Sequence, residues 1–337
     1  MILSIQNKAL KIFLIICIVL LILVILAGIV LCGISYSKDK DLKDVRIMGY
    51  YIGDLTDDEL DKIKLNEYTN ILYGFAYANE TTGFPDLSEA KKSGLVNFLA
   101  YKQKHNLDLK FQLCIGSFDT EKLLDESYRK EYASKCKELV DTYNLDGIDI
   151  DWEYPQNDAE YYAFGQLLYE IRQAIGNSKL LSFAATTTLY QVDEYDNKLI
   201  QSVVDYVNVM TYDFSLEKQS NVITTKIILL NYFVTKGYKK SMLNIGVPFY
   251  GRSASKEYEY YGYNSLMDMV DNGELTLVEK SDYSYAYGQY GQVSFDTAKI
   301  TKKKAKFVKR CNFGGIFTWH ISCDRNNELL DAMLYAK

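Results

Sequence analysis

Histidine is almost absent from the sequence, since only His105 and His320 occur among 337 residues. A zinc site built from three imidazoles is therefore excluded, and a Ser-His-Asp or Cys-His catalytic group would have to use one of these two rings. The six cysteines show no Cys-x-x-Cys spacing, which argues against a metal or redox motif of that kind. Chemistry in this chain must depend on carboxylates, tyrosines or a cofactor.

An excess of basic residues is also missing. The chain has 38 Lys and Arg residues against 44 Asp and Glu, and its formal charge is −6. This balance argues against a phosphate backbone as the ligand, so no nucleic-acid partner is expected. The hydrophobic share of 48% and the charged share of 24% are typical of a globular protein. The 30 tyrosines fit either aromatic platforms for sugars or a compositional bias, and both interpretations stay open.

Charged residues are absent from one long stretch near the N-terminus, Ile12 to Ile34. As a helix it would span about 34 Å at roughly 1.5 Å per residue, enough for a hydrocarbon core of about 30 Å. We predict a transmembrane signal-anchor at residues 12–34, between a short tail (1–11) and a linker (35–45). A long cleaved signal peptide is the alternative. The expected protein is membrane-anchored with its globular part extracellular or lumenal, or secreted if this segment is removed.

Beyond residue 45, short runs rich in β-branched and aromatic residues alternate with amphipathic helical patterns. The runs are Arg46–Ile52, Asn70–Tyr77, Leu109–Ser117, Leu145–Glu153, Leu180–Thr187, Asp205–Asp213, Leu243–Phe249 and Phe313–His320. Eight strand–helix units predict an α/β fold, the (β/α)8 TIM barrel, over residues 46–337. An open doubly wound sheet often shows a glycine-rich loop after its first strand, and Gly49–Asp54 is not one. A short insertion is expected after strand seven, at about residues 253–296.

The fourth predicted strand carries a row of acids. Alternate side chains of a strand share one face, so Asp149, Asp151 and Glu153 are expected to point into the barrel. Carboxyls that lie close together on one face repel each other when charged. This repulsion separates their pKa values and can keep one of them protonated near neutral pH. Glu153 comes last, at the carboxyl end where barrel enzymes place their active sites, and can act as a proton donor. Asp146, one residue out of phase, is expected to hold the turn at the start of the strand with Gly147.

The acid row could also be an exposed edge strand or a cation site. An exposed acidic edge strand fits poorly, because Ile148, Ile150 and Trp152 alternate with the acids. A cation site of three carboxylates is chemically possible, since hard cations prefer oxygen ligands. Calcium sites usually draw on loops and mixed ligands, so no metal is expected here.

With these motifs the chain resembles the family 18 glycoside hydrolases, the chitinase family. The segment from Asp146 to Glu153 matches the family signature D-x-x-D-x-D-x-E at every fixed position. Further motifs of the family are matched by Gly49–Tyr51, Tyr73–Tyr77, Met210–Phe214, Gly246–Arg252 and Gly314–Trp319. One departure concerns the third strand, where the usual S-x-G-G reads Cys114-Ile-Gly116-Ser117.

The resemblance implies hydrolysis of β-1,4-linked N-acetylglucosamine polymers, chitin or its oligosaccharides, with retention and through an oxazolinium ion formed by the substrate's own acetamido group. Carried over by position, Glu153 protonates the departing oxygen and Asp151 orients the acetamido N–H. Asp149 shares a proton with Asp151, and Tyr212 donates its hydroxyl to the acetamido oxygen. No cofactor and no metal is implied.

The resemblance also implies a set of sugar contacts. Trp319 is expected to form the floor of the subsite that holds the reacting sugar. The other implied contacts are Tyr50, Phe75, Asp213, Arg252 and Met210, of which Met210 is explained equally well by barrel packing. A monomer is expected.

The sequence leaves alternatives to a chitinase open. They are an endo-β-N-acetylglucosaminidase acting on N-glycans or peptidoglycan, and a non-catalytic chitin-binding lectin of the same fold. Cys311 and Cys323 flank the eighth predicted strand, where they form either a disulfide or two separate buried thiols.

Overall fold

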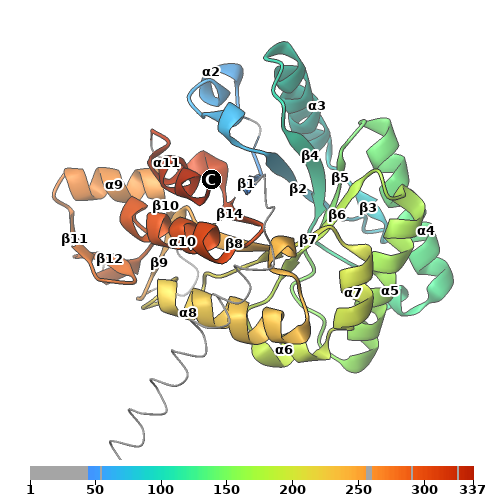
Figure 1. Ribbon diagram of the computed structural model, residues 1–337. Coiled ribbons are helices and arrows are strands. Elements are labelled where there is room, and N and C mark those ends of the chain that lie inside the picture. The colour runs from blue at the N-terminus through green and yellow to red at the C-terminus, as the bar shows by residue number, and fades with distance from the viewer. Residues whose placement is uncertain (1–44, 54, 256–259, 290, 325) are drawn as a thin grey trace, which may run out of the picture. The chain divides into compact units, whose positions relative to one another are not determined.

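The structure is a computed structural model that describes residues 45–53, 55–255, 260–289, 291–324 and 326–337 (Figure 1). The predicted N-terminal tail, the membrane segment and nearly all of the linker lie outside these residues. Among the residues that are described, no helix combines the length and the apolar character needed to cross a membrane.

Eight parallel strands form a closed barrel with helices on its outside (Figure 1). The strands are β1 (Arg46–Tyr51), β2 (Asn70–Ala78), β4 (Lys110–Ile115), β5 (Gly147–Ile150), β6 (Leu180–Ala185), β7 (Tyr206–Val209), β8 (Leu243–Pro248) and β14 (Gly315–Trp319). The barrel closes because β1 pairs with β14 on one side and with β2 on the other. The predicted TIM barrel is therefore confirmed. The two-residue strand β3 (Pro85–Asp86) adds to β2 in the antiparallel sense.

The two strands that carry most of the predicted catalytic residues are shorter than predicted. β5 stops at Ile150, and β7 stops at Val209. Beyond β7 the backbone turns sharply, since Asp213 has a φ of 57° in the left-handed region. The acids and tyrosines that follow these strands are thus held by the chain just above the barrel rather than within the strand ladder.

The helices form where the spacing of apolar residues predicts them. α3 (Glu89–Lys104), α4 (Glu126–Thr142), α5 (Asp158–Ile175) and α10 (Ala298–Cys311) are the long ones. The side chain of Ser88 accepts a hydrogen bond at the start of α3, and that of Asn157 does so at the start of α5, as N-cap residues do. The shorter helices are α2 (Asp57–Leu60), α6 (Leu189–Glu194), α7 (Asn197–Val203), α8 (Val222–Ile227), α9 (Tyr263–Asp271) and α11 (Glu328–Met333).

A small antiparallel sheet follows β8, in the order β10-β9-β13-β12-β11. Its strands are β9 (Tyr250–Ser253), β10 (Tyr260–Gly262), β11 (Leu275–Glu279), β12 (Ser284–Gly288) and β13 (Gly291–Ser294), and α9 lies between β10 and β11. The insertion begins a few residues before the predicted position of about 253. The reason is that β9 leaves the barrel and pairs with β10 and β13 instead.

Asp146 and Gly147 fix the start of β5, at the end of the barrel opposite the carboxyl ends of its strands. One carboxylate oxygen of Asp146 accepts the backbone N–H of Phe111 at 2.8 Å, and the other accepts from Lys110 at 3.2 Å. A Cβ atom on Gly147 would lie 2.0 Å from the carbonyl oxygen of Leu180. Only glycine therefore allows β5 and β6 to approach this closely.

Cys323 is a free, buried thiol. It therefore does not pair with Cys311, so a disulfide between these two residues is excluded.

Candidate active site

The acids of β5 and of the segment after it alternate as expected. Ile148 and Ile150 are fully buried, and the Trp152 ring packs on the outer side against Phe118 (ring centroids 5.3 Å apart) and Phe164 (6.0 Å). The acids become more accessible along the row, since Asp149 is fully buried, Asp151 is 7% exposed and Glu153 is exposed. The row thus runs from the barrel interior to its mouth.

Asp149 is held by four donors inside the barrel. Its Oδ2 accepts from the Tyr50 hydroxyl at 2.8 Å and from the Cys114 thiol at 3.2 Å. Its Oδ1 accepts from Ser182 Oγ at 2.5 Å and from Asn208 Nδ2 at 3.2 Å. Burial raises the pKa of Asp149, and these hydrogen bonds oppose that rise because they favour the charged form. These four bonds fix the side chain in one position. Cys114 is a donor at the place where the family's usual S-x-G-G motif has its serine.

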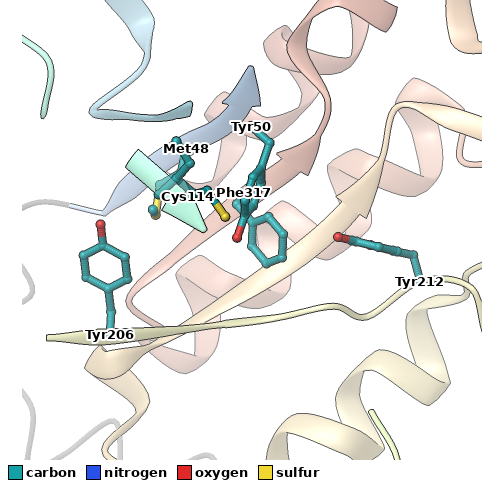
Figure 2. Close-up of a cluster of buried hydrophobic side chains, with 7 residues drawn as sticks. Met48, Tyr50, Cys114, Tyr206, Tyr212 and Phe317 are labelled. Atoms are coloured by element: carbon teal, nitrogen blue, oxygen red, sulfur yellow. The ribbon is translucent and has the colours of Figure 1, made fainter. Parts of the chain in front are cut away.

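Tyr50 and Cys114 belong to a cluster of side chains inside the barrel (Figure 2). Met48, Leu72, Tyr206, Tyr212 and Phe317 complete it, and Phe75, Met210 and Trp319 pack against it. Figure 2 shows Met48, Tyr50, Cys114, Tyr206 and Phe317 entering the interior from several strands, together with Tyr212 from the segment after β7. The base of the candidate site is therefore the packed core itself.

Asp151 is the least satisfied of the three acids. Its Oδ1 atom is buried and has no hydrogen-bond partner among the described residues. Burial raises the pKa of Asp151 well above its usual value, and the charges of Glu153 and Asp149 raise it further. An oxygen in this state is prepared to bind a polar hydrogen that arrives with a ligand, because an unpaired buried acceptor costs about 1–3 kcal/mol.

Glu153 occupies the mouth of the row. Although much of its side chain is exposed, the crowded surroundings of the carboxyl raise its pKa, and the nearby charge of Asp213 raises it too. Hydrogen bonds with Tyr154 and Asp151 act in the opposite direction. A carboxyl with a raised pKa keeps its proton to higher pH than an ordinary glutamic acid, as a general acid requires.

A cavity of about 580 Å³ opens where these residues end. It is lined by Tyr50, Phe75, Tyr77, Gly116, Asp151, Glu153, Tyr154, Ala184, Thr186, Thr187, Thr188, Met210, Tyr212, Asp213, Tyr250, Arg252, Tyr260 and Trp319. All six residues predicted to contact substrate are in this set, together with three of the four predicted catalytic residues. Asp149 lies below the cavity, while Asp146 and Gly147 are at the other end of β5.

Aromatic rings form one wall of the cavity. The Trp319 ring stacks on Phe75 with centroids 5.6 Å apart and an interplanar angle of 29°, and it contacts Tyr50 at 5.5 Å. Tyr212, which also lines the cavity, packs edge-on against Phe317 with ring centroids 6.2 Å apart, and this contact fixes its ring. Such a surface can hold the apolar face of a pyranose ring.

Another part of the rim is polar and connects the barrel to the insertion. The Oδ2 atom of Asp213 accepts the Tyr250 hydroxyl at 2.7 Å. Its Oδ1 atom lies 3.6 Å from Arg252 Nε and accepts Gln219 Nε2 at 3.3 Å. Burial, followed by the charge of Asp213, raises the pKa of the Tyr250 hydroxyl well above its usual value, so this group stays a donor.

Several cavity residues were not predicted from the sequence. Tyr77 shares a strand face with Phe75, so the alternation of β2 could have identified it. Thr186 to Thr188 directly follow β6, and their position at a strand's carboxyl end was a usable signal. Tyr260 belongs to the insertion, and nothing in the sequence places it beside residues of the barrel.

Within the described ranges, no group of three or more His, Cys, Asp and Glu side chains is arranged to hold a metal ion. The oxygens of Asp149 are already occupied by four protein donors.

Comparison with known proteins agrees with this geometry. The family model of the glycosyl hydrolases family 18 matches residues 46–324. The chain belongs to this family. A class V chitinase of Arabidopsis thaliana is 26% identical, and the match covers 78% of this chain and 82% of the relative. Chitinase B of Serratia marcescens is 24% identical, and the match covers 80% of this chain and 76% of the relative.

Solved structures share the fold at lower sequence identity. The class V chitinase from Nicotiana tobaccum has a TM-score of 0.78 and 22% identity, with 87% of this chain and 99% of that one covered. A mutant of that enzyme in complex with NAG4 gives the same TM-score at 21% identity. The predicted family is confirmed, and the chain is a chitinase-like glycoside hydrolase of family 18.

Proposed function

We propose that this protein hydrolyses β-1,4 links between N-acetylglucosamine units of chitin or chitin oligosaccharides, with the acetamido group of the substrate as the nucleophile. The observation that carries the proposal is the position of Glu153 above Asp151 in one acid row at an aromatic-walled cavity. The inner carboxyl has an unpartnered oxygen, and the outer one has a raised pKa. The names of the relatives described above support the same substrate class.

The first step needs an acid, because a glycosidic oxygen is a poor leaving group. Glu153 donates its proton to that oxygen as the bond to the anomeric carbon breaks. The acetamido carbonyl oxygen attacks the same carbon from the opposite side and forms a cyclic oxazolinium ion. Water then attacks the anomeric carbon and opens the ring, and Glu153 takes a proton from this water. The intramolecular nucleophile supplies proximity that a free water molecule lacks.

The residues beneath and beside Glu153 stabilise this path. The free Oδ1 atom of Asp151 accepts the acetamido N–H, and its charge balances the positive charge that develops on the ring. Asp149, fixed by its four donors, acts on Asp151 through its charge, which raises the pKa of Asp151. The Tyr212 hydroxyl keeps its proton, because burial raises its pKa well above the usual value, and it donates to the acetamido oxygen. Trp319 holds the sugar face.

The anomeric form of the first product tests this mechanism directly. When residues 45–337 are incubated with N-acetylglucosamine oligomers, proton NMR is expected to show the β anomer before mutarotation. Two displacements at the same carbon, first by the acetamido oxygen and then by water, return the original configuration. An α product formed first would overturn the substrate-assisted mechanism.

The natural glycan can be tested in the same format. Chitin oligosaccharides, N-glycans and peptidoglycan, offered side by side at equal concentration, are expected to be cleaved at clearly different rates, with chitin oligosaccharides first. Preferred cleavage of N-glycans or peptidoglycan would replace the proposed substrate. Binding of chitin oligosaccharides with no cleavage at all would favour a lectin.

Asp213→Asn is expected to shift the basic limb of the pH profile of kcat/KM to lower pH. The charge of Asp213 raises the pKa of Glu153, so its removal lets Glu153 lose its catalytic proton at lower pH. The amide oxygen of the new side chain can still accept the Tyr250 hydroxyl bond. Rates are measured from pH 4 to 9, with Asp119→Asn, which does not line the cavity, as the control. A basic limb that moves to higher pH, or does not move, would contradict this assignment.

A further inference from the structure

A second groove lies on the outer wall of the barrel, between α8 and α10, and has a volume of about 530 Å³. The two helices lie beside each other in Figure 1. The groove is lined by Val222, Ile223, Lys226, Ser281, Asp282, Lys303, Lys306, Phe307 and Arg310. It shares none of these residues with the cavity described above.

Four of the lining residues are cationic, against one acid, Asp282. Lys303, Lys306 and Arg310 follow one another at intervals of three and four residues, so they project from one face of α10. Lys226 faces them from α8 and lies over the Phe307 ring, 5.5 Å from its centroid. The charge of the whole chain is negative, and the count over 337 residues conceals this concentration of positive charge.

Among the described residues these cations have no acidic partner, unlike the lysines of α4. On α4, Lys130 bonds to Glu126 and Lys137 bonds to Asp141, each one turn away. Over the described part of the chain, Lys226, Lys306 and Arg310 form no ion pair. Lys303 donates to the backbone carbonyl oxygen of Ser281.

The concentration of positive charge affects the pKa of Lys226. Burial lowers the pKa of its ammonium group, and the charges of Arg310 and Lys303 lower it further. Like charges in one groove destabilise the folded protein unless an anion balances them. The arrangement is therefore better explained as a ligand site than as a stabilising feature.

We propose that this groove binds a linear polyanion, a chain of phosphodiester-linked polyol units. The cations of α10 repeat about once per helical turn, roughly 5.4 Å, and a short polyol between phosphates spaces its charges on a comparable scale. A flat anionic bilayer fits a concave groove poorly. A single-stranded nucleic acid fits poorly as well, because binding sites for single strands present exposed aromatic rings on which the bases stack. The one aromatic ring of this groove, Phe307, is only 4% exposed beneath Lys226.

Binding here leaves the catalytic cavity open. The groove is built by α8, α10 and the turn between β11 and β12, whereas the cavity is built by segments that follow the barrel strands. A polyanion in the groove would therefore hold the hydrolase on an anionic matrix without competing with its glycan. This proposal does not depend on the substrate proposed above.

The test measures binding of an end-labelled poly(glycerol phosphate) to the full chain by fluorescence anisotropy in 50 mM salt. Lys303→Glu/Arg310→Glu is expected to weaken binding by roughly 30-fold or more, because each cation near an anionic surface contributes about a factor of five. In a plot of the logarithm of the binding constant against the logarithm of the salt concentration, the magnitude of the slope should decrease by roughly 1.4, because two phosphate contacts are lost. Hydrolysis of soluble chitin oligosaccharides should stay unchanged, which shows that the variant is folded.

A variant with the same change of charge provides the control. Lys62→Glu/Lys198→Glu alters two exposed lysines that do not line the groove, and it is expected to bind within threefold of the unmodified chain. Equal loss in this control would show that only overall charge matters. Absence of binding by the unmodified chain, or tighter groove-dependent binding of DNA, of phosphatidylserine vesicles or of a sulfated polysaccharide, would also overturn the proposal.

Discussion

Glu153→Gln is expected to lower kcat for chitin oligosaccharides by roughly 10²- to 10⁴-fold, the usual contribution of a general acid. Glutamine has nearly the same shape and can still form a hydrogen bond, but it cannot transfer a proton to the glycosidic oxygen. The aromatic wall and the Asp151 oxygen that would bind the acetamido group are unchanged. The dissociation constant of a tetrasaccharide, measured by calorimetry, should therefore change by less than about threefold.

Glu121→Gln makes the same chemical change on an exposed side chain outside the cavity and should leave kcat unaltered. Two results would contradict the assignment of the acid. One is a Glu153→Gln enzyme with full kcat. The other is a loss of oligosaccharide binding as large as the loss of kcat, since that would make Glu153 a binding residue.

The fold could be predicted because the strand patterns, the helix patterns and their alternation all indicate the same architecture. Eight apolar runs alternate with helical patterns, and parallel neighbours need such crossovers. The acid row could be predicted for a related reason, because a period of two places Asp149, Asp151 and Glu153 on one face however the strand ends. That β5 stops at Ile150 did not matter, since the alternation continues after the ladder has stopped.

Other features depend on contacts between distant segments, which no local pattern records. The Tyr250 hydroxyl bonds to Asp213 across 37 residues, and Asp149 gathers donors from four other strands. The early departure of β9 depends on its partner strands β10 and β13. The membrane segment at 12–34 lies outside the described residues and stays a prediction.

Lys304→Met is expected to lower the free energy of unfolding by about 3–5 kcal/mol at neutral pH. Lys304 and Asp296 are both fully buried, and their charged atoms lie 2.6 Å apart between α10 and the end of the insertion. The lysine also contacts the Ser220 hydroxyl, which in turn donates to the carbonyl oxygen of Thr211 at 3.0 Å. Removing the ammonium leaves Asp296 as a buried carboxylate without a counter-charge.

The control lies on the same helix. Lys299→Met breaks the ion pair between Lys299 and Glu279, whose side chains are 51% and 30% exposed, respectively. It should lower the free energy of unfolding by less than about 1 kcal/mol. The double variant Lys304→Met/Asp296→Leu should recover most of the stability, because apolar residues often replace a buried ion pair without loss. All variants are compared by urea unfolding.

The pH dependence separates a lost ion pair from lost packing. Burial already raises the pKa of Asp296, and removing Lys304 raises it further because the lysine charge opposes that rise. Consider a carboxyl whose pKa is higher in the folded than in the unfolded chain. It does not change the free energy of unfolding at pH values below its pKa in the unfolded chain, about 3.9, and it destabilises the folded protein progressively as the pH rises above that value. The deficit of Lys304→Met should therefore be larger at pH 7.5 than at pH 4.5. A deficit that is equal at both values would mean that the lysine acts by filling space. In that case Thr211, and with it the adjacent Tyr212, would be held by packing rather than by charge.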